Sequence, residues 1–203
     1  MKTYKSNFVQ VFLLTLWVGL AGCEPANVPG LSELNASYEE AIRRSSDAVA
    51  FAPGSAEEAR VLTRLEGYFT DMTEASALES VADVYAPEGY LNDNIVGIFG
   101  AEKIGKYFAH AAAQSEQFTV EFVDVARSGV DYYVRWEMTV QVPALSEGRP
   151  VVSYGVSHFR FDAEGRVLLH RDFWDAATGM YEHLPYVGGL VRYVHGKLAA
   201  GTD

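Results

Sequence analysis

His170 and Asp172 are an imidazole and a carboxylate two residues apart in an apolar stretch, Arg166–Trp174. The stretch predicts a β-strand, in which alternate residues share a face. One face then carries Leu168, His170, Asp172 and Trp174. A carboxylate in an apolar pocket has a raised pKa, which suits proton transfer near neutral pH. The pattern predicts a half-buried polar site for acid–base chemistry. Its alternative is a strand at a sheet edge whose two polar residues lie in water.

Two other patterns associated with catalysis fail on their context. Gly100–Lys106 fits the letters of a phosphate-binding P-loop, but Tyr107 follows where magnesium binding needs Ser or Thr. Residues 155–157 begin like the nucleophile elbow of a serine hydrolase, but Phe159 stands in place of the second glycine. Neither a nucleotide site nor a serine nucleophile is therefore expected.

The pattern of histidines gives little support for metal binding. The chain has five, and no two have metal-ligand spacing: His110, His158, His170, His183 and His195. Asp93, His170 and Asp172 are a set that can converge on a metal ion, but carboxylate–imidazole pairs without metal are commoner. The sequence predicts neither a metal site nor a cofactor.

The composition excludes some classes of partner. The 203-residue chain is 49% hydrophobic and 13% aromatic, which fits one compact domain with a sizeable core and an additional segment. Its net charge is −11, and an acidic body repels phosphate backbones, so nucleic acid is not an expected partner. Cys23 is the single cysteine of the chain, so no intrachain disulfide can form.

Residues 1–22 predict a bacterial lipoprotein signal peptide. The segment has a basic start, and its apolar run, Val9–Leu20, is shorter than the roughly 20 apolar residues of a membrane span. The run ends in Leu-Ala-Gly-Cys. This sequence resembles the lipobox of bacterial lipoproteins, in which the cysteine is lipidated and becomes the first mature residue. The alternative is an ordinary signal peptide beside an incidental cysteine.

Lipidation of Cys23 predicts where the protein is found. A thioether-linked diacylglycerol and an N-acyl chain bury enough methylene groups for stable membrane attachment. Glu24, rather than aspartate, follows the cysteine, which resembles the outer-membrane signal of enterobacteria. We therefore expect a lipoprotein of the bacterial cell envelope, anchored in the outer membrane and facing the periplasm.

Residues 23–54 predict a tether with a spacer helix at 31–51, and residues 55–203 predict a folded domain. The domain begins with a capping-box pattern at Ser55 and Glu58, followed by helical spacing up to Met72. Further helices are predicted at 75–85, 101–113 and about 186–199. Strands are predicted at 90–94, 118–126, 131–142, 151–161 and 166–174. Helices followed by an antiparallel meander indicate the α+β class.

The C-terminal helix has an apolar stripe formed by Val187, Leu190, Val191, Val194 and Leu198. Packing of this stripe on the domain is the favoured interpretation. Its alternative is contact with lipid, because Arg192, His195 and Lys197 lie beside the stripe.

With these elements in order, residues 55–174 resemble the nuclear transport factor 2-like (NTF2-like) superfamily, which includes SnoaL-like polyketide cyclases, ketosteroid isomerases and limonene epoxide hydrolases. The most specific segments are Tyr90–Asp93, Val156–Phe161 and His170–Asp175. The resemblance implies a curved, mostly antiparallel sheet wrapped on three N-terminal helices, forming a cone with an internal pocket, plus the C-terminal helix. Such proteins include enzymes, binding modules and dimerisation domains, so the fold does not determine function.

The resemblance also implies catalytic roles. Tyr68 matches the tyrosine that donates a hydrogen bond to the substrate oxyanion in ketosteroid isomerases, and Asp93 matches their proton-transferring base. Ser157 falls where those isomerases hold a protonated aspartate, and a serine donates a weaker hydrogen bond. Asp172 matches one of the paired acids of limonene epoxide hydrolases, and His170 shares its strand face.

Apolar residues are expected to line the implied pocket and bind the ligand. Trp174 matches such a wall, and Trp136, Met138 and Phe159 are expected there together with Ser157. The arginine and second aspartate of limonene epoxide hydrolases fall near Trp136 and Met138, so neither known catalytic set is complete.

A shift of one residue in the strand 131–142 is the alternative, and it puts Arg135 and Glu137 inside. The first register is preferred because the apolar face of the strand should meet the helices. Arg135, Glu137 and Arg171 then lie on the outer face of the sheet. Relatives often pair through that face, which makes a homodimer an expected assembly.

Two functions fit these observations. The first is a membrane-anchored domain whose apolar pocket binds a small hydrophobic molecule without catalysis, and the incomplete catalytic sets favour it. The second is an acid–base enzyme of the isomerase, cyclase or epoxide hydrolase type that uses Asp93, Asp172 or both. The number of acids expected in the pocket favours this second function.

Overall fold

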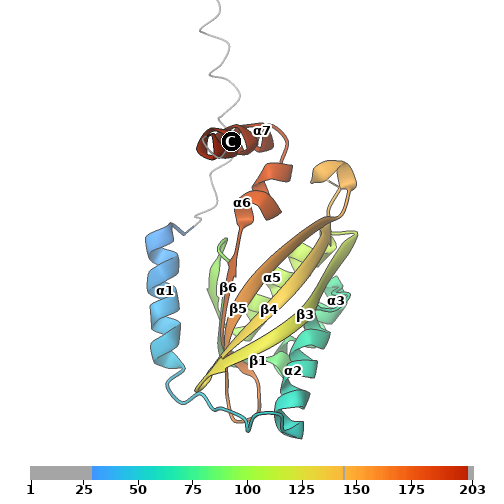
Figure 1. Ribbon diagram of the computed structural model, residues 1–203. Helices are drawn as coiled ribbons and strands as arrows, with labels where there is room; N and C mark the ends of the chain where they lie inside the picture. Colours follow the sequence, from blue (N-terminus) through green and yellow to red (C-terminus); the bar gives the residue numbers. More distant parts are fainter. Residues whose placement is uncertain (1–28, 144, 201–203) are drawn as a thin grey trace, which may run out of the picture.

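The computed structural model describes residues 29–143 and 145–200. Its strands are β1 (Tyr85–Asn92), β2 (Gly97–Phe99), β3 (Gln117–Ser128), β4 (Asp131–Gln141), β5 (Val151–Phe161) and β6 (Val167–Trp174). Within the described ranges they form one curved sheet in the order β2-β1-β6-β5-β4-β3, in which β1 and β6 are parallel and the other pairs antiparallel (Figure 1). The predicted α+β class with a mostly antiparallel sheet is confirmed.

Helices pack on the inner side of this sheet. They are α2 (Ala56–Phe69), α3 (Glu74–Glu79), α4 (Val81–Val84) and α5 (Ala101–Ala113). The segment 75–85, predicted as one helix, is instead α3 and α4 separated by Ser80, and Tyr85 already belongs to β1. Apolar side chains of α2 and α5 form one core cluster with inward-facing residues of the strands. The cluster includes Leu65 of α2, Phe108 of α5 and Phe159 of β5.

Helix α2 begins at the predicted N-cap. Ser55 Oγ accepts a hydrogen bond from the Glu58 N–H at 3.1 Å, which is the first half of a capping box. The Glu58 carboxylate accepts from the Gly54 N–H at 2.6 Å, and it also pairs with Arg127 of β3 at 2.6 Å. The start of α2 is thereby joined to the sheet that it packs on.

Strand β4 has the register that puts Trp136 and Met138 inside. Trp136 is 5% exposed, whereas Arg135 on the other face forms an exposed ion pair with Asp124 of β3. Gly155 of β5 lies opposite Trp136, and a Cβ at this glycine would be 2.3 Å from the indole ring. The preferred register is confirmed, and it depends on the space that Gly155 leaves for Trp136.

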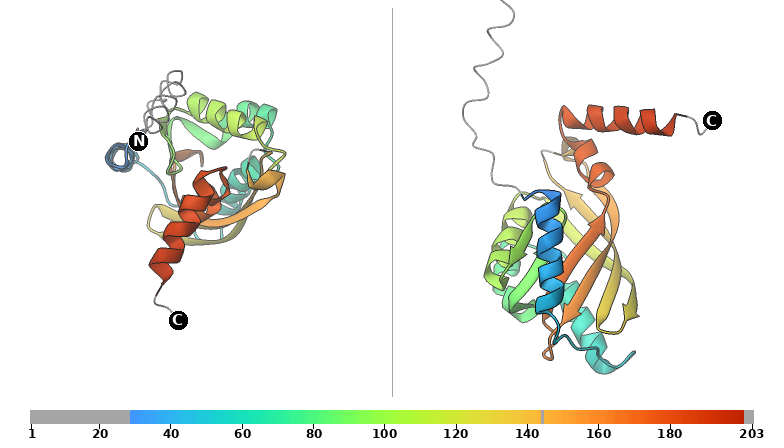
Figure 2. Two further views of the ribbon diagram at one scale, coloured as in Figure 1. Left: turned by 90° about the horizontal axis from the view of Figure 1, so that it is seen from above. Right: turned by 90° about the vertical axis from the view of Figure 1, so that its left-hand side faces the viewer.

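Helix α1 (Leu31–Arg44) packs beside the sheet, on the face opposite the core helices (Figure 2). Its Ala41 is buried in a small cluster with Tyr90 and Leu169 of the sheet. Beyond the helix, Val49 forms a bridge with Phe161 of β5. The predicted spacer helix is therefore corrected: it ends at Arg44 and belongs to the folded domain, because its small and apolar side chains have a surface to pack on.

The packing of α1 also changes the expected surroundings of Arg171. This residue points to the outer face, as the strand alternation predicts, but it is 7% exposed and not in solvent. Its guanidinium hydrogen-bonds the Asn92 side chain and lies 5.8 Å from the Tyr38 ring of α1 and 5.2 Å from the Phe173 ring. The helix covers the part of the outer face that β6 forms.

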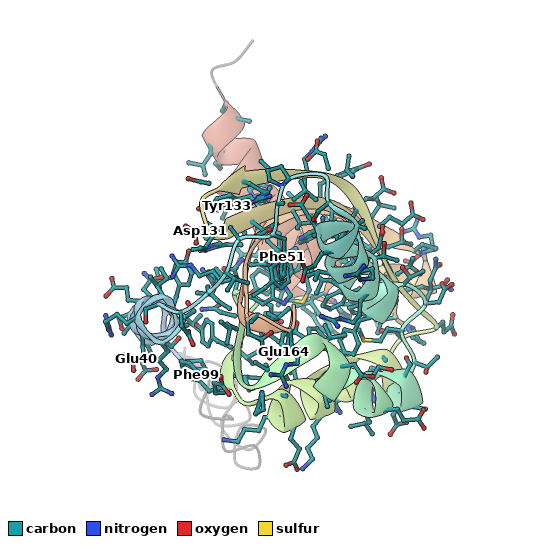
Figure 3. The ribbon with its side chains drawn as sticks, turned by 90° about the horizontal axis from the view of Figure 1, so that it is seen from below. Glu40, Phe51, Phe99, Asp131, Tyr133 and Glu164 are labelled. Carbon is teal, nitrogen blue, oxygen red and sulfur yellow. The ribbon has the colours of Figure 1, made fainter. Side chains whose placement is uncertain are left out.

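The end of the domain opposite α7 is filled by side chains around Phe51. Seen from the end opposite α7, Phe51 lies at the centre of the ring of elements, while Glu40 of α1 points away from the domain (Figure 3). Phe51 is buried in the core cluster, and its N–H donates to the Tyr132 hydroxyl at 3.0 Å. This end of the cone is therefore closed by packed side chains.

At the other end, β6 is followed by α6 (Ala176–Gly179), η2 (Tyr181–His183) and α7 (Val187–Ala199), near the short turn η1 (Ser146–Gly148) (Figures 1 and 2). Helix α7 forms where it is predicted. Its apolar stripe does not pack on the domain, because Leu190 is 64% and Leu198 79% exposed. The favoured interpretation of that stripe is therefore wrong.

None of the helices in the described part of the chain is long and apolar enough to cross a membrane. The predicted signal segment 1–22, the lipidation site Cys23 and Glu24 lie outside the described residues.

Candidate functional site

A cavity of about 280 Å³ lies between the inner face of the sheet and α5. This volume is just below the usual range of about 300–1,000 Å³ for small-molecule sites. Most of the wall is apolar, and it includes Phe69, Phe108, Trp136, Met138, Phe159 and Trp174. The polar side chains that line it are Asp93, Tyr107, Gln114, Ser115, Ser157, His170 and Asp172. A few polar groups in an apolar cavity are typical of a ligand site.

His170 and Asp172 are joined by a hydrogen bond at the inner face of β6. His170 Nε2 is 2.7 Å from Asp172 Oδ1, and His170 Nδ1 is 2.7 Å from the Tyr85 hydroxyl oxygen. Burial raises the pKa of Tyr85 well above its ordinary value, so its hydroxyl is protonated. We therefore assign the O–H of Tyr85 as donor to Nδ1 and the N–H at Nε2 as donor to Asp172.

A second chain of hydrogen bonds reaches the same carboxylate oxygen. Trp136 Nε1–H donates to Ser157 Oγ at 2.8 Å, and the Ser157 hydroxyl donates to Asp172 Oδ1. Asp172 Oδ1 therefore has two donors, from β5 and β6. Oδ2 of the same carboxylate takes part in none of the hydrogen bonds among the described residues, and it is the oxygen that remains for a ligand.

The His170 ring is held by packing as well as by hydrogen bonds. The ring is 3% exposed, and its centroid lies 4.3 Å from that of Phe159. Phe69 of α2 makes an edge contact with it at 5.8 Å. The imidazole therefore has one orientation, with Nε2 directed at Asp172.

Asp93 follows β1 in the turn that leads to β2. Its Oδ1 accepts two backbone N–H groups, from Ile95 at 2.9 Å and Val96 at 3.0 Å. Its Oδ2 accepts from the Tyr107 hydroxyl of α5. Burial raises the pKa of Asp93 in spite of these donors, and the nearby Asp172 carboxylate adds to the increase.

Trp174 is a residue of the cavity wall that is hydrogen-bonded to the backbone of Asp93. Its indole Nε1–H donates to the backbone carbonyl of Asp93 at 2.9 Å. Gly179 of α6 lies against its other side, where a Cβ would be 2.8 Å from the ring. Trp174 is thus a half-buried wall residue near the end of the cavity where α6 lies.

Tyr68 lies apart from the other predicted site residues. It is 6% exposed in the core, and its hydroxyl donates to the Ala77 carbonyl of α3 at 3.0 Å. The residue is not part of the cavity wall. The structure therefore brings Asp93, Ser157, His170 and Asp172 together with Trp136, Met138, Phe159 and Trp174, but it does not bring Tyr68 to them.

Two tyrosines of the site, Tyr85 and Tyr107, fall within the predicted helices 75–85 and 101–113 and were not predicted as site residues. Tyr107 lies on the buried stripe of α5 and bonds Asp93, and Tyr85 bonds His170. The available signal is chemical: a tyrosine hydroxyl on a buried stripe needs a polar partner. That signal identifies Tyr107 as a polar residue of the core but does not identify its partner.

The cavity holds two carboxyl groups, those of Asp93 and Asp172, whose surroundings differ. Asp93 has a raised pKa and a tyrosine beside it, whereas Asp172 accepts hydrogen bonds from Ser157 and His170. Two carboxylates in different surroundings within one site can act as acid and base. Across the described residues, no three His, Cys, Asp or Glu side chains are grouped closely enough to hold a metal ion.

Solved structures of other proteins share this fold. A protein with a ketosteroid isomerase-like fold from Catenulispora acidiphila DSM 44928, solved with trimethylamine, is 15% identical, with a TM-score of 0.53 over 66% of this chain and 96% of its own. An LEH-like epoxide hydrolase from M. tuberculosis is 17% identical, with a TM-score of 0.51 over 71% and 99%. TsrD from Streptomyces laurentii is 14% identical, with a TM-score of 0.53 over 66% and 97%.

At these identities the likeness shows the fold alone. No protein of curated function matches the chain. The SnoaL-like domain matches residues 65–170, just over half of the 203 residues. The range begins in α2 and ends at His170, and it contains Asp93, Tyr107 and Ser157. The chain therefore belongs to the SnoaL-like domain family of NTF2-like proteins.

Proposed function

We propose that the domain is an acid–base enzyme that acts on a small, largely apolar molecule in the cavity. One observation carries this proposal: Asp172 is held by hydrogen bonds on Oδ1 from Ser157 and His170, while Oδ2 remains for a ligand. Oδ2 is not among the buried unpaired side-chain atoms of the described residues, and Asp172 lines the cavity, so a ligand there can reach this oxygen.

In this proposal Asp172 is the base and Asp93 the acid. Asp172 Oδ2 takes a proton from a C–H bond next to a carbonyl group, and the electron pair of that bond moves toward the carbonyl oxygen. Because Asp93 Oδ1 accepts two backbone N–H groups, the proton of neutral Asp93 is on Oδ2. Asp93 then donates to the developing oxyanion, while the Tyr107 hydroxyl donates to Asp93 Oδ2 and holds the acid in place. The raised pKa of Asp93 favours its protonated form.

The same pair fits the opening of an epoxide. Asp172 Oδ2 then takes a proton from water as the water oxygen attacks carbon, and Asp93 gives its proton to the epoxide oxygen. Both reactions need an apolar cavity that holds the substrate, and the wall formed by Trp136, Met138 and Phe159 provides one.

The second candidate is ligand binding without turnover. The position of Tyr68 favours it, because the hydroxyl expected to donate to a substrate oxyanion instead donates to the Ala77 carbonyl. In this case the acids and Tyr107 recognise polar atoms of a bound hydrophobic molecule. In either case we propose that lipidated Cys23 attaches the chain to the membrane of the cell envelope, through the Leu-Ala-Gly-Cys sequence at 20–23.

Two measurements together distinguish the candidates. Mass spectrometry of the protein purified from membranes identifies molecules bound in the cavity, and deuterium exchange in heavy water follows proton abstraction from a panel of apolar ketones. We expect Asp172→Asn to slow exchange roughly 10²–10⁴-fold while ligand affinity changes little. Asp71→Asn, at an exposed position outside the cavity lining, is the matched control. Ligand binding by the wild type without exchange, and without hydrolysis of apolar epoxides, supports the second candidate.

A further inference from the structure

Helix α7 exposes an apolar stripe at the end of the domain near α6. Leu190, Val194 and Leu198 lie on this stripe and are 64%, 43% and 79% exposed. A helix of a soluble domain ordinarily turns such a stripe to the core. Gly188 is the one residue of α7 that is buried. The described part of the chain therefore leaves the stripe without a surface to pack on, and contiguous exposed apolar surface marks interaction sites.

The turn before α7 holds the stripe in this orientation. A Cβ at Gly188 would be 2.1 Å from the carbonyl oxygen of Glu182, so the helix backbone is pressed against η2 there. Arg192 Nη1 donates to the same carbonyl at 2.9 Å. Gly188 and Arg192 are four residues apart and share a helix face. That face is attached to η2, and the stripe lies on the side turned away from it.

The charge of α7 is opposite to that of the rest of the protein. The helix contains Arg192, His195 and Lys197 and no acidic residue, whereas the chain has a net charge of −11. Lys197 Nζ lies 5.5 Å from the Tyr193 ring, beside the stripe. An apolar stripe flanked by basic and aromatic side chains is the pattern of helices that lie in the interface of a bilayer.

The position of α7 agrees with the proposed lipid attachment. Helix α1 begins at the end of the domain where α7 lies (Figures 1 and 2). Cys23 precedes Pro29, the first described residue, by a stretch of chain that spans at most about 20 Å. A lipid on Cys23 would therefore hold this end of the domain close to the bilayer.

We propose that α7 lies flat in the interface of a bilayer that contains anionic lipids. Leu190, Val194 and Leu198 contact acyl chains, and Lys197, which lies beside the stripe, contacts headgroups. The 13 residues of α7 are too few to span a bilayer. Gly179 and Met180 line the cavity just before η2, so a ligand dissolved in the bilayer would enter from this side. The inference rests on the membrane attachment proposed above and is independent of the acid–base chemistry.

The test uses the full chain in vesicles of phosphatidylethanolamine and phosphatidylglycerol. A fluorophore is attached at Leu198→Cys or, as the matched control, at Gly196→Cys, where nothing lies within 4 Å of an added Cβ. Quenchers on the lipid acyl chains report contact with the bilayer interior. We expect quenching at 198 to be roughly threefold stronger than at 196, since the two positions lie on different faces of α7. The wild type gives the background labelling of Cys23.

Three outcomes overturn the inference. Equal quenching at the two positions, in a chain that floats with the vesicles, leaves the lipid anchor intact but places α7 in water. Energy transfer between labels on two chains, with no lipid quenching, shows that a second copy covers the stripe. A chain that does not float with vesicles overturns both the anchor and the proposed position of α7.

Discussion

The hydroxyl of Tyr38 in α1 and the Nδ1 atom of His158 in β5 are 2.8 Å apart, although 120 positions of sequence separate the two residues. His158 Nε2 lies 2.7 Å from the Asp131 carboxylate, so we assign the imidazole proton to Nε2 and the Tyr38 O–H as donor to Nδ1. Arg160 also bonds Asp131, and it donates to the carbonyl of Ile42 at 3.0 Å. These contacts join α1 to the outer face of the sheet.

Tyr38→Phe is expected to destabilise the domain by about 1 kcal/mol, the usual net contribution of one partly buried hydrogen bond. The ring contacts with His158 and Phe173 remain in this variant. Urea unfolding measures the change, and Tyr193→Phe on exposed α7 is the matched control. An equal midpoint for Tyr38→Phe and wild type would mean that the hydrogen bond does not hold α1.

The docking of α1 shows where sequence reasoning ends. Tyr38, Ala41 and Ile42 give the helix a partial apolar face, which predicts its existence but not its partner. Its partners on β5 and β6 include His158 and Arg171, which the strand alternation correctly places on the outer face. Strand alternation gives the face of a residue but not what covers that face, so Arg171 was expected at a dimer interface or in solvent.

The residues that face the inside of the sheet were easier to predict, because the alternation of side chains is a pattern within a single strand. The alternation of apolar and polar residues in β4 identifies Trp136 and Met138 as inward-facing. In β6 the alternation puts His170 and Asp172 on one face with Trp174, and the resemblance of Trp174 to a pocket wall implies that this face is the inner one. The link between Asp93 and Tyr107 spans a turn and a helix, and no periodic pattern reports it. Tyr68 was assigned by resemblance, and its hydroxyl direction depends on the position of α3, which the sequence does not predict.

Stability should depend on pH through Asp93. Burial raises its pKa in the folded state, so the folded protein binds this proton more tightly than the unfolded chain. The resulting stability is present below the unfolded pKa of about 3.9 and is lost as pH rises through the folded pKa. Asp93→Asn should remove this loss, at up to about 1.4 kcal/mol per pH unit between the two pKa values.

Free energies of unfolding for the wild type and Asp93→Asn, measured in steps from pH 4 to pH 8, test this expectation. The variant should gain stability relative to the wild type as pH rises. Asp71→Asn, at an exposed position, is the control. Parallel curves for the wild type and Asp93→Asn would show that the Asp93 carboxyl has the same pKa in both states.

Gly155→Ala is expected to destabilise the domain by about 1–3 kcal/mol, the usual cost of overpacking. An added Cβ would be 2.3 Å from the Trp136 ring, so the indole has to move. Trp136 Nε1 then loses its bond to Ser157, which in turn positions Asp172. Gly189→Ala, where nothing lies within 4 Å of the added atom, should change stability little. Thermal melts and tryptophan fluorescence measure both effects.

The part of the outer face that α1 does not cover is where a homodimer would form. Val152 and Tyr154 of β5 are 51% and 65% exposed there. We expect residues 29–203 to sediment as a dimer at micromolar concentration, and Val152→Lys with Tyr154→Lys to sediment as a monomer, because two charges would be buried at the contact. A monomeric wild type at high micromolar concentration would exclude this assembly.

Replacement of Trp174 tests whether the cavity wall and the acid site depend on each other. Trp174→Ala removes a half-buried indole and its hydrogen bond to the Asp93 carbonyl, and we expect a cost of about 2 kcal/mol, below the range for fully buried tryptophan. Trp174→Phe keeps a ring against Gly179 but lacks the N–H donor, so it should recover part of the stability.

The pKa of Asp93, followed by NMR titration of its carboxyl carbon, should fall in Trp174→Ala because water gains access to the carboxyl group. It should stay nearer the wild-type value in Trp174→Phe. If Trp174→Ala lowers the melting temperature but leaves the pKa of Asp93 unchanged, Tyr107 and the turn after β1 maintain the burial of this acid without the indole.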